Sequence, residues 1–168
     1  VMAPNRSHHL FFKRFLASFP DAAGFIAPGL AEKIGDLATY PVIPMHGPWD
    51  TELTSWFIEG LPVIHETVWF HAPTGTLVLT DLLFCFETRA PGLTRLVAGI
   101  LGVHNRLGMS LTMKLMVKDK AALRRSIEPL LSLPVQRIVL AHEQIVDDQP
   151  MKKLRDAFAW LGHGHAQA

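Results

Sequence analysis

Three segments of the sequence end in side chains that could bind a metal ion. His8 and His9 follow the short apolar stretch at 1–4, Asp81 follows the apolar run that begins at Thr76, and His142 follows the run at 135–141. In open α/β sheets, ligands bind beyond the ends of strands. Histidine nitrogens combined with a carboxylate oxygen suit zinc or iron. The pattern therefore predicts one metal site at one edge of a sheet.

Each of these segments also has a purely structural interpretation. Ser7 could cap a helix, with one of the two following histidines packed and the other in solvent. Asp81 could accept hydrogen bonds from backbone N–H groups in the turn after its strand. His142 could be a surface residue just beyond its strand. The metal site is favoured only because the three segments are expected to meet at one edge.

The elements that would position these side chains alternate between strands and helices. In the first half we expect helices at 8–19, with Ser7 as N-cap, and at 30–37, and strands at 1–4, 23–27, 54–59, 63–71 and 76–84. The last two strands, joined by a turn at 72–75, should form a hairpin. The continuous apolar run at 77–79 predicts that both faces of its strand are covered.

The second half is expected to be mostly helical. It should contain a helix at 107–117, a helix that starts at Lys120 with Asp119 as its N-cap, a strand at 135–141 and an amphipathic helix at 151–161. The stretch at 93–103 is ambiguous, and Pro129 should kink or end the helix that precedes it. This order of elements predicts a mixed α/β fold in which helices cover a sheet.

The composition excludes several classes of protein. Of 168 residues, 49% are hydrophobic and 18% are charged, which is too apolar for a disordered chain. A formal net charge of +1 predicts no nucleic-acid partner, and no apolar stretch reaches the roughly 18 residues of a transmembrane helix. A single cysteine, Cys85, favours a reducing, cytoplasmic location. The sequence lacks the glycine motifs of serine hydrolases and nucleotide enzymes, and we expect a small-molecule substrate.

Several stretches together resemble the metallo-β-lactamase superfamily. They include Ala3-Pro4-Asn5-Arg6-Ser7-His8-His9-Leu10, Leu79-Thr80-Asp81-Leu82 and Val139-Leu140-Ala141-His142. The first fits the Ala-Pro-Asn-x-x-His-His-Leu signature of an uncharacterised branch, a domain family of unknown function. The resemblance implies an α/β fold of the αββα four-layer sandwich type, with residues 1–161 as one domain and 162–168 as a flexible tail. It also implies that the first strands of the sandwich are missing, and the exposed edge would favour self-association.

The resemblance further implies which residues hold the metal. The superfamily's second metal position falls on His8, His9, Asp81 and His142. Two histidines of its first metal position fall on Pro4 and Arg6, which cannot replace them. The third falls near Val63, two residues from His65. The implied site is therefore mononuclear and holds one divalent metal ion, zinc rather than iron.

The activity implied by the resemblance is that of a metal-dependent, hydrolase-like enzyme in which the metal activates water. Asp81 and Glu66 would be its catalytic residues, with Glu66 orienting an imidazole or acting as a general base. Two alternatives stay open. The chain could keep the fold for binding or structure without a metal, or two histidines and a carboxylate could hold iron in a mononuclear oxidoreductase.

Overall fold

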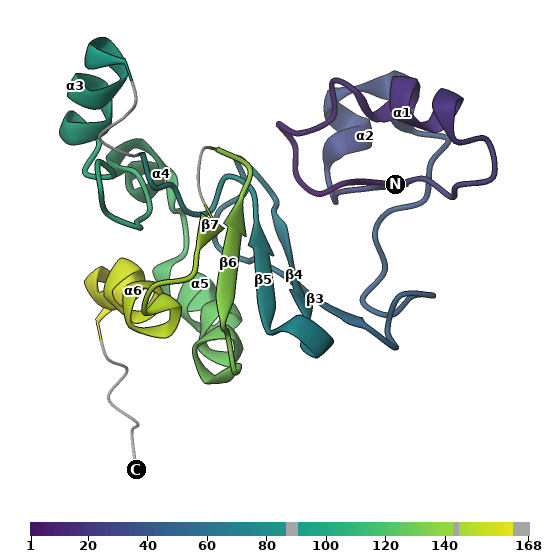
Figure 1. Cartoon of the computed structure of the whole chain (residues 1–168). Coiled ribbons are helices and arrows are strands. Elements are labelled where there is room, and N and C mark those ends of the chain that lie inside the picture. The colour runs from purple at the N-terminus through teal and green to yellow at the C-terminus, as the bar shows by residue number, and fades with distance from the viewer. Residues whose placement is uncertain (87–90, 143–144, 163–168) are drawn as a thin grey trace.

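The computed structural model describes residues 1–86, 91–142 and 145–162. Its centre is a five-stranded sheet with the strand order β3-β4-β5-β6-β7. The strands are β3 (Leu53–Phe57), β4 (Thr67–His71), β5 (Thr76–Leu79), β6 (Arg137–Leu140) and β7 (Ile145–Val146). Neighbouring strands are antiparallel except β5 and β6, which are parallel. With helices packed beside this sheet (Figure 1), the fold is mixed α/β, as the sequence predicts.

The predicted hairpin is confirmed by the antiparallel pairing of β4 with β5. A short 3-10 turn, Ala72–Thr74, joins the two strands, and Gly75 follows it with a φ of 59°. The strand β4 begins at Thr67 and not at residue 63, because His65 has a φ of 48°, which an extended strand does not allow. The expectation that both faces of 77–79 are covered is wrong: Leu77 and Leu79 are buried, but Val78 is half-buried.

Two helices pack on one side of the sheet. They are α5 (Lys120–Ile127) and α6 (Pro150–Phe158), which is extended by a 3-10 turn at Ala159–Leu161. Their apolar side chains share the main core with Leu77 and Ile138 of the sheet. Asp119 caps α5 as predicted, since its Oδ1 accepts the N–H of Ala122 at 2.9 Å. The helix ends at Ile127, and residues Glu128–Ser132 continue as a 3-10 turn that contains Pro129.

The N-terminal elements form a smaller unit beside the sheet (Figure 1). Strand β1 (Met2–Ala3) pairs in parallel with β2 (Phe25–Ile26), and the helices α1 (Phe12–Ser18) and α2 (Leu30–Lys33) pack against them, followed by a 3-10 turn at Gly35–Leu37. Their side chains build a second apolar cluster around Ile26 and Leu30. Ser7 is not the cap of α1: the helix begins after Phe11, and residues 5–11 form turns instead.

The ambiguous stretch after residue 91 is helical. It forms α3 (Gly92–Ile100), and α4 (Leu111–Met116) follows with Ser110 as its N-cap. In the described part of the chain, no helix has the length and apolar character needed to cross a membrane. The tail expected at 162–168 lies, from residue 163 onward, outside the described residues.

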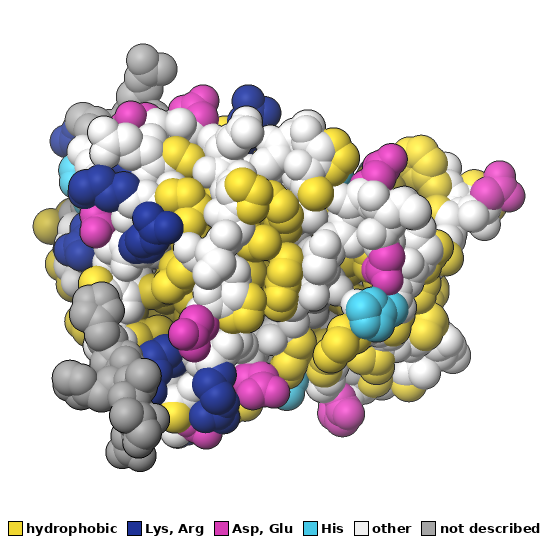
Figure 2. Space-filling model, turned by 90° about the horizontal axis from the view of Figure 1, so that it is seen from below, with side chains coloured by type: hydrophobic (Ala, Val, Ile, Leu, Met, Phe, Trp, Pro, Cys, Tyr) yellow, Lys and Arg dark blue, Asp and Glu magenta, His cyan; other side chains and the backbone are white. Residues whose placement is uncertain are grey.

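Charge is distributed unevenly over the surface. Figure 2 views the molecule from below and shows Lys and Arg side chains on the half that carries α5 and α6. The half that carries β3 shows Asp, Glu and His side chains on this face, and no Lys or Arg. On this face, the Lys and Arg side chains are mixed with Asp and Glu side chains on the first half and are missing from the second.

Candidate metal centre

The register between β5 and β6 places Asp81 beside His142. Leu79 pairs with Leu140 in the parallel ladder, and Asp81 and His142 each lie two residues beyond this pair. Because parallel strands end at the same edge of a sheet, the two side chains leave the sheet at the same level. His142 Nε2 lies 3.2 Å from Asp81 Oδ1.

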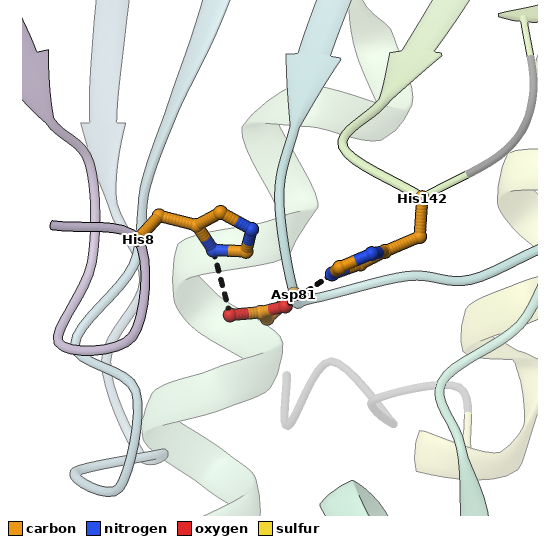
Figure 3. Close-up of side chains that lie close together, drawn as sticks. All are labelled: His8, Asp81 and His142. Carbon is orange, nitrogen blue, oxygen red and sulfur yellow. Dashed lines mark hydrogen bonds and ion pairs between the residues drawn. The ribbon is translucent and has the colours of Figure 1, made fainter. Parts of the chain in front are cut away.

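His8 reaches the same point from the N-terminal unit. The N–H of Thr67 donates to Pro4 O at 2.9 Å, and the N–H of Arg6 donates to Ile64 O at 2.8 Å. These two bonds attach residues 4–6 to the segment that leads into β4. The chain then turns, and His8 Nδ1 lies 3.0 Å from Asp81 Oδ2. Figure 3 shows Asp81 between the two imidazoles, with one carboxylate oxygen toward each ring.

The geometry of the three side chains suits a single metal ion. One donor atom each from His8, Asp81 and His142 lies within 4.8 Å of the other two. Ligands at about 2.0–2.1 Å in a tetrahedral zinc site lie roughly 3.3 Å apart, so donor atoms that lie within 4.8 Å of one another would have to draw closer around an ion. Three protein ligands leave a fourth position open, which is the arrangement of catalytic rather than structural zinc sites. The residues present therefore fit zinc or another divalent ion of similar preference.

Asp81 is held by a buried polar network. Asn5 Nδ2 donates to Asp81 Oδ2 at 2.9 Å and to Thr80 Oγ1 at 2.7 Å. Glu66 accepts the N–H of Thr80 through Oε1 and the N–H of Asp81 through Oε2, each at 2.7 Å. Asn5 and Glu66 are both completely buried. This network fixes the backbone and the carboxylate of Asp81 before any ligand binds.

Asn5 is the functional residue that sequence reasoning missed. Its Oδ1 accepts the N–H groups of Ser7 and His8 at 2.7 and 2.8 Å, so that its side chain shapes the turn that presents His8. The available signal was an Asn two residues before a Ser-His pair, because Asn side chains often bond to the backbone two residues ahead. Ser7, which was expected to cap the helix, contributes its N–H and not its hydroxyl.

The charges of the group perturb its protonation. The hydrogen bond to Asp81, supported by the carboxylate charge, raises the pKa of His8. Burial alone would raise the pKa of Asp81, but its bonds with His8, Asn5 and His142 outweigh burial and lower it. Burial raises the pKa of Glu66, against the hydrogen bonds from the backbone of Thr80 and Asp81. In the metal-free protein, His8 and Asp81 therefore favour the imidazolium–carboxylate pair.

Two predicted roles need correction. His9 is not part of the group that gathers around Asp81. Burial, with the charges of Lys33 and His8, lowers the pKa of His9. Glu66 was expected to face an imidazole, but its carboxylate is occupied by the backbone of Thr80 and Asp81 and by Asn5 Nδ2 at 3.3 Å. Glu66 is completely buried, and its carboxylate holds the backbone of Thr80 and Asp81.

His65 does not approach the group either. Its Nδ1 lies 2.9 Å from Pro28 O, and its ring makes an edge contact with Phe57 at a centroid distance of 5.7 Å. The structure thus brings together three of the four predicted ligands: His8, Asp81 and His142.

The orientation of His142 depends on a neighbouring aromatic ring. Phe84 stacks on the imidazole with a centroid distance of 5.6 Å and an interplanar angle of 20°. The N–H of Phe84 donates to Gly108 O at 2.9 Å, which anchors this ring to the segment before α4. Since the side chain of His142 is 42% exposed, the stacking limits its rotation where the core does not.

A groove opens beside the group. It has a volume of about 630 Å³ and is bordered by His8, His9 and Thr80 and by apolar side chains of the N-terminal unit, including Phe11 and Phe15. Pockets of about 300–1,000 Å³ with mostly apolar walls and a few polar groups are typical of small-molecule sites. Of the three residues His8, Asp81 and His142, His8 borders this pocket.

No protein-family model matches the chain, and no curated protein matches it. The resemblance to the metallo-β-lactamase superfamily accordingly rests on the motifs of the sequence, and the site's chemistry has to be argued from its own geometry.

Proposed function

We propose that this chain is a mononuclear metal-dependent hydrolase-like enzyme. The observation that carries the proposal is the convergence of His8, Asp81 and His142, which come from three separate segments. His8 also borders a largely apolar pocket. Three ligands with an open fourth position belong to catalytic metal sites. The two histidines and the carboxylate would hold zinc, or iron if that ion is available in its place.

Each residue has a separate task in this proposal. A bound zinc ion would supply a water of lowered pKa and would polarise the oxygen of a scissile carbonyl or phosphoryl group. Asp81 would be a ligand, and without a metal its two oxygens pair with the imidazoles of His8 and His142. Asn5 and Glu66 hold Asp81 in place in either case. His9, at the border of the groove and outside the group, is placed to bind the substrate. The apolar wall formed by Phe11 and Phe15 would take the non-reacting part of a small molecule.

We further propose that the fold belongs to the metallo-β-lactamase type, an αββα sandwich. Support comes from the signature at 3–10 and from ligands at the ends of two parallel neighbours, β5 and β6. Helices α5 and α6 on one side of the five-stranded sheet would be an outer layer of that sandwich. The small β1–β2 sheet would belong to its other half.

A second candidate is a non-catalytic protein in which the same three residues form a structural polar network. This second candidate is supported by the contacts of the two imidazoles. His8 and His142 each contact a different oxygen of Asp81, at 3.0 and 3.2 Å. Asp81 Oδ2 also receives Asn5 Nδ2, so the buried carboxylate is satisfied without a metal. This alternative predicts that the protein folds normally and binds no metal.

Metal analysis of the purified chain separates the two candidates. The protein is stripped with a chelator, reloaded separately with zinc and with iron(II), desalted, and analysed for metal per chain. The enzyme proposal predicts about one ion per chain for the wild type. It predicts loss of that ion in His142→Ala and its retention in the matched control His9→Ala, since His9 lies outside the group. A folded wild-type protein with no metal would leave the structural network as the better account.

Hydrolysis is then assayed with the zinc-loaded protein. Esters, amides and phosphate esters that carry an apolar group are suitable probes, because the groove walls are mainly apolar. Turnover that is present with zinc, absent after chelation and absent in His142→Ala would support the proposal. Metal binding without turnover of any of these classes, combined with oxidation of a substrate by the iron form, would favour the mononuclear oxidoreductase.

A further inference from the structure

Helix α3 turns its apolar face to solvent. Leu93, Leu96, Val97 and Ile100 recur at intervals of three and four residues and so lie on one side of the helix. Their exposed fractions are 75, 62, 46 and 67%, whereas Ala98 on the opposite side is buried. A surface helix of a globular protein normally turns such a face toward the core. Single exposed apolar residues are ordinary, but a whole exposed face marks an interaction site.

Helix α4 extends this apolar surface. Leu111, Leu115 and Met116 are exposed by 49, 76 and 42%. The N–H of Leu111 donates to Leu101 O at 3.1 Å, which joins the start of α4 to the end of α3. Figure 1 shows the two helices next to each other, with α3 at the far end of the molecule from the N-terminal unit. We call these seven exposed apolar side chains the α3–α4 surface.

The segment that carries the α3–α4 surface is strongly basic. Residues 91–120 contain the cations Arg95, Arg106, Lys114, Lys118 and Lys120. The segment's one acidic residue, Asp119, uses its carboxylate to cap α5. An apolar helix face accompanied by Lys and Arg is the pattern of helices that lie in the interface of an anionic membrane.

Helix α1 offers an internal comparison. Large apolar side chains are also exposed on this helix and in the turn before it, among them Phe15 at 51% and Phe11 at 71%. Its surroundings are electrically balanced, however: residues 10–36 contain the cations Lys13, Arg14 and Lys33 and the acids Asp21, Glu32 and Asp36. The exposure of apolar side chains is therefore similar for α1 and for the α3–α4 surface, and the two differ in the net charge of the segment that carries them.

Two lysines of this segment lie over the indole of Trp160. The ammonium groups of Lys114 and Lys120 lie 5.5 and 5.7 Å from the centre of its ring. The indole itself packs against the main core and its Nε1 is buried, so the two ammonium groups are the parts of this cluster that could contact head groups. These residues connect the end of α4 with the start of α5 and with the turn after α6.

We propose that the α3–α4 surface binds the face of a lipid bilayer that contains anionic lipids. The apolar side chains of α3 and α4 would enter the layer between head groups and acyl chains, and the surrounding Lys and Arg side chains would contact lipid phosphates. Helix α3 has nine residues, about half of the roughly 20 needed to span a bilayer, so it would lie along the membrane surface. This surface is distinct from the metal group, and the inference does not depend on the proposed hydrolase activity.

The test is sedimentation of the full chain with vesicles. One set is made of phosphatidylcholine alone and the other contains about 30% phosphatidylglycerol, which gives a negative surface. We expect binding to the anionic vesicles to be at least roughly tenfold stronger, and to weaken as salt rises from about 0.05 to 0.5 M. The variant Leu96→Gln/Ile100→Gln should lose at least about tenfold in binding, and Arg106→Gln/Lys118→Gln should lose the preference for anionic vesicles.

The matched control is Leu10→Gln/Phe15→Gln, on α1 and in the turn before it. It removes exposed apolar side chains from a balanced surface and should bind vesicles as the wild type does. Circular dichroism of each variant shows that the fold is kept, since all substituted side chains are exposed. The proposal is overturned if the wild type binds neither vesicle, if it binds both equally, or if only the α1 variant loses binding. It is also overturned if sedimentation without lipid shows an oligomer that Leu96→Gln/Ile100→Gln dissociates, because that surface would then join two copies of the chain.

Discussion

Asn5 donates a hydrogen bond from its side-chain amide to Asp81 Oδ2 at 2.9 Å, across 76 positions of sequence. The carbonyl oxygen of the same side chain accepts the N–H of His8 at 2.8 Å. One buried amide thus sets the position of two members of the metal group. The N-terminal unit and the central sheet are therefore joined at the site itself.

Replacing Asn5 by Ala should damage the site and the fold together. The substitution removes the amide donor to Asp81 Oδ2 and leaves the turn at residues 5–8 without its acceptor. We expect the free energy of unfolding to fall by about 2 kcal/mol and zinc affinity to fall by roughly 10–100-fold. Urea unfolding and zinc titration measure the two effects. Asn5→Asp should be worse, because it adds a third carboxylate next to Asp81 and Glu66; equal stability of this variant and the wild type would contradict the network.

Replacing Glu66 by Gln tests whether both carboxylate oxygens are needed as acceptors. Each oxygen accepts one backbone N–H, from Thr80 or from Asp81. The amide group of Gln would turn two donors toward one of these N–H groups. We expect a loss of roughly 1–3 kcal/mol in the free energy of unfolding, measured by thermal or urea denaturation. If Glu66 were instead a general base, the substitution would abolish turnover and leave stability unchanged.

The protonation of His8 can be followed by NMR in the metal-free protein. Its bond to Asp81 raises its pKa above the ordinary value of 6.5, so its ring should titrate above that value. In Asp81→Asn the pKa should drop, because the hydrogen bond to a charged carboxylate and its attraction are both lost while burial stays. Measurement of the pKa of His9 in the same spectra provides a control, since burial lowers it.

The same pair predicts how metal-free stability depends on pH. The raised pKa of His8 adds to the free energy of unfolding. This stabilisation is complete below 6.5, the pKa of His8 in the unfolded chain, and is lost as pH rises through the raised pKa of the folded state. The lowered pKa of Asp81 also adds to the free energy of unfolding. This stabilisation is present above 3.8, the pKa of Asp81 in the unfolded chain, and is lost as pH falls through the lowered pKa of the folded state. The pair should therefore stabilise the fold most between these unfolded values. Urea unfolding across pH should show this maximum, and it should be reduced in His8→Ala.

Gly60 provides a test of the packing that supports the sheet. Its φ is 78°, and a Cβ at this position would overlap Asp119 O and lie 2.8 Å from the backbone nitrogen of Leu123. Gly60→Ala should therefore cost about 3 kcal/mol or more in the free energy of unfolding. Gly99→Ala in α3 is the matched control, because a Cβ there meets nothing within 4 Å. It should stabilise the helix by roughly 0.5–1 kcal/mol, and equal effects of the two changes would argue against the close contact at Gly60.

The sequence by itself was sufficient for features that depend on local periodicity and on short motifs. The hairpin of β4 and β5, the Asp119 cap of α5 and the strand before His142 follow from residues close together in the chain. Asp81 and His142 could be named as candidates because each follows an apolar strand and was expected at one edge of the sheet. That β5 and β6 are parallel neighbours, which brings these two side chains together, was decided by the tertiary structure.

The remaining features were decided by the tertiary structure. Whether His8 or His9 faces Asp81 depends on the turn at residues 5–8, and that turn is shaped by Asn5, whose amide is in turn bound to Asp81. The task of Glu66 depends on two N–H groups 14 and 15 positions away. The pattern of apolar residues in the sequence does not predict such contacts. The direction of a side chain in a turn depends on partners that are distant in sequence and come close only in the folded chain. For the same reason, the outward face of α3 could not be told from a core-facing one, since the periodicity of an amphipathic helix is identical in both cases.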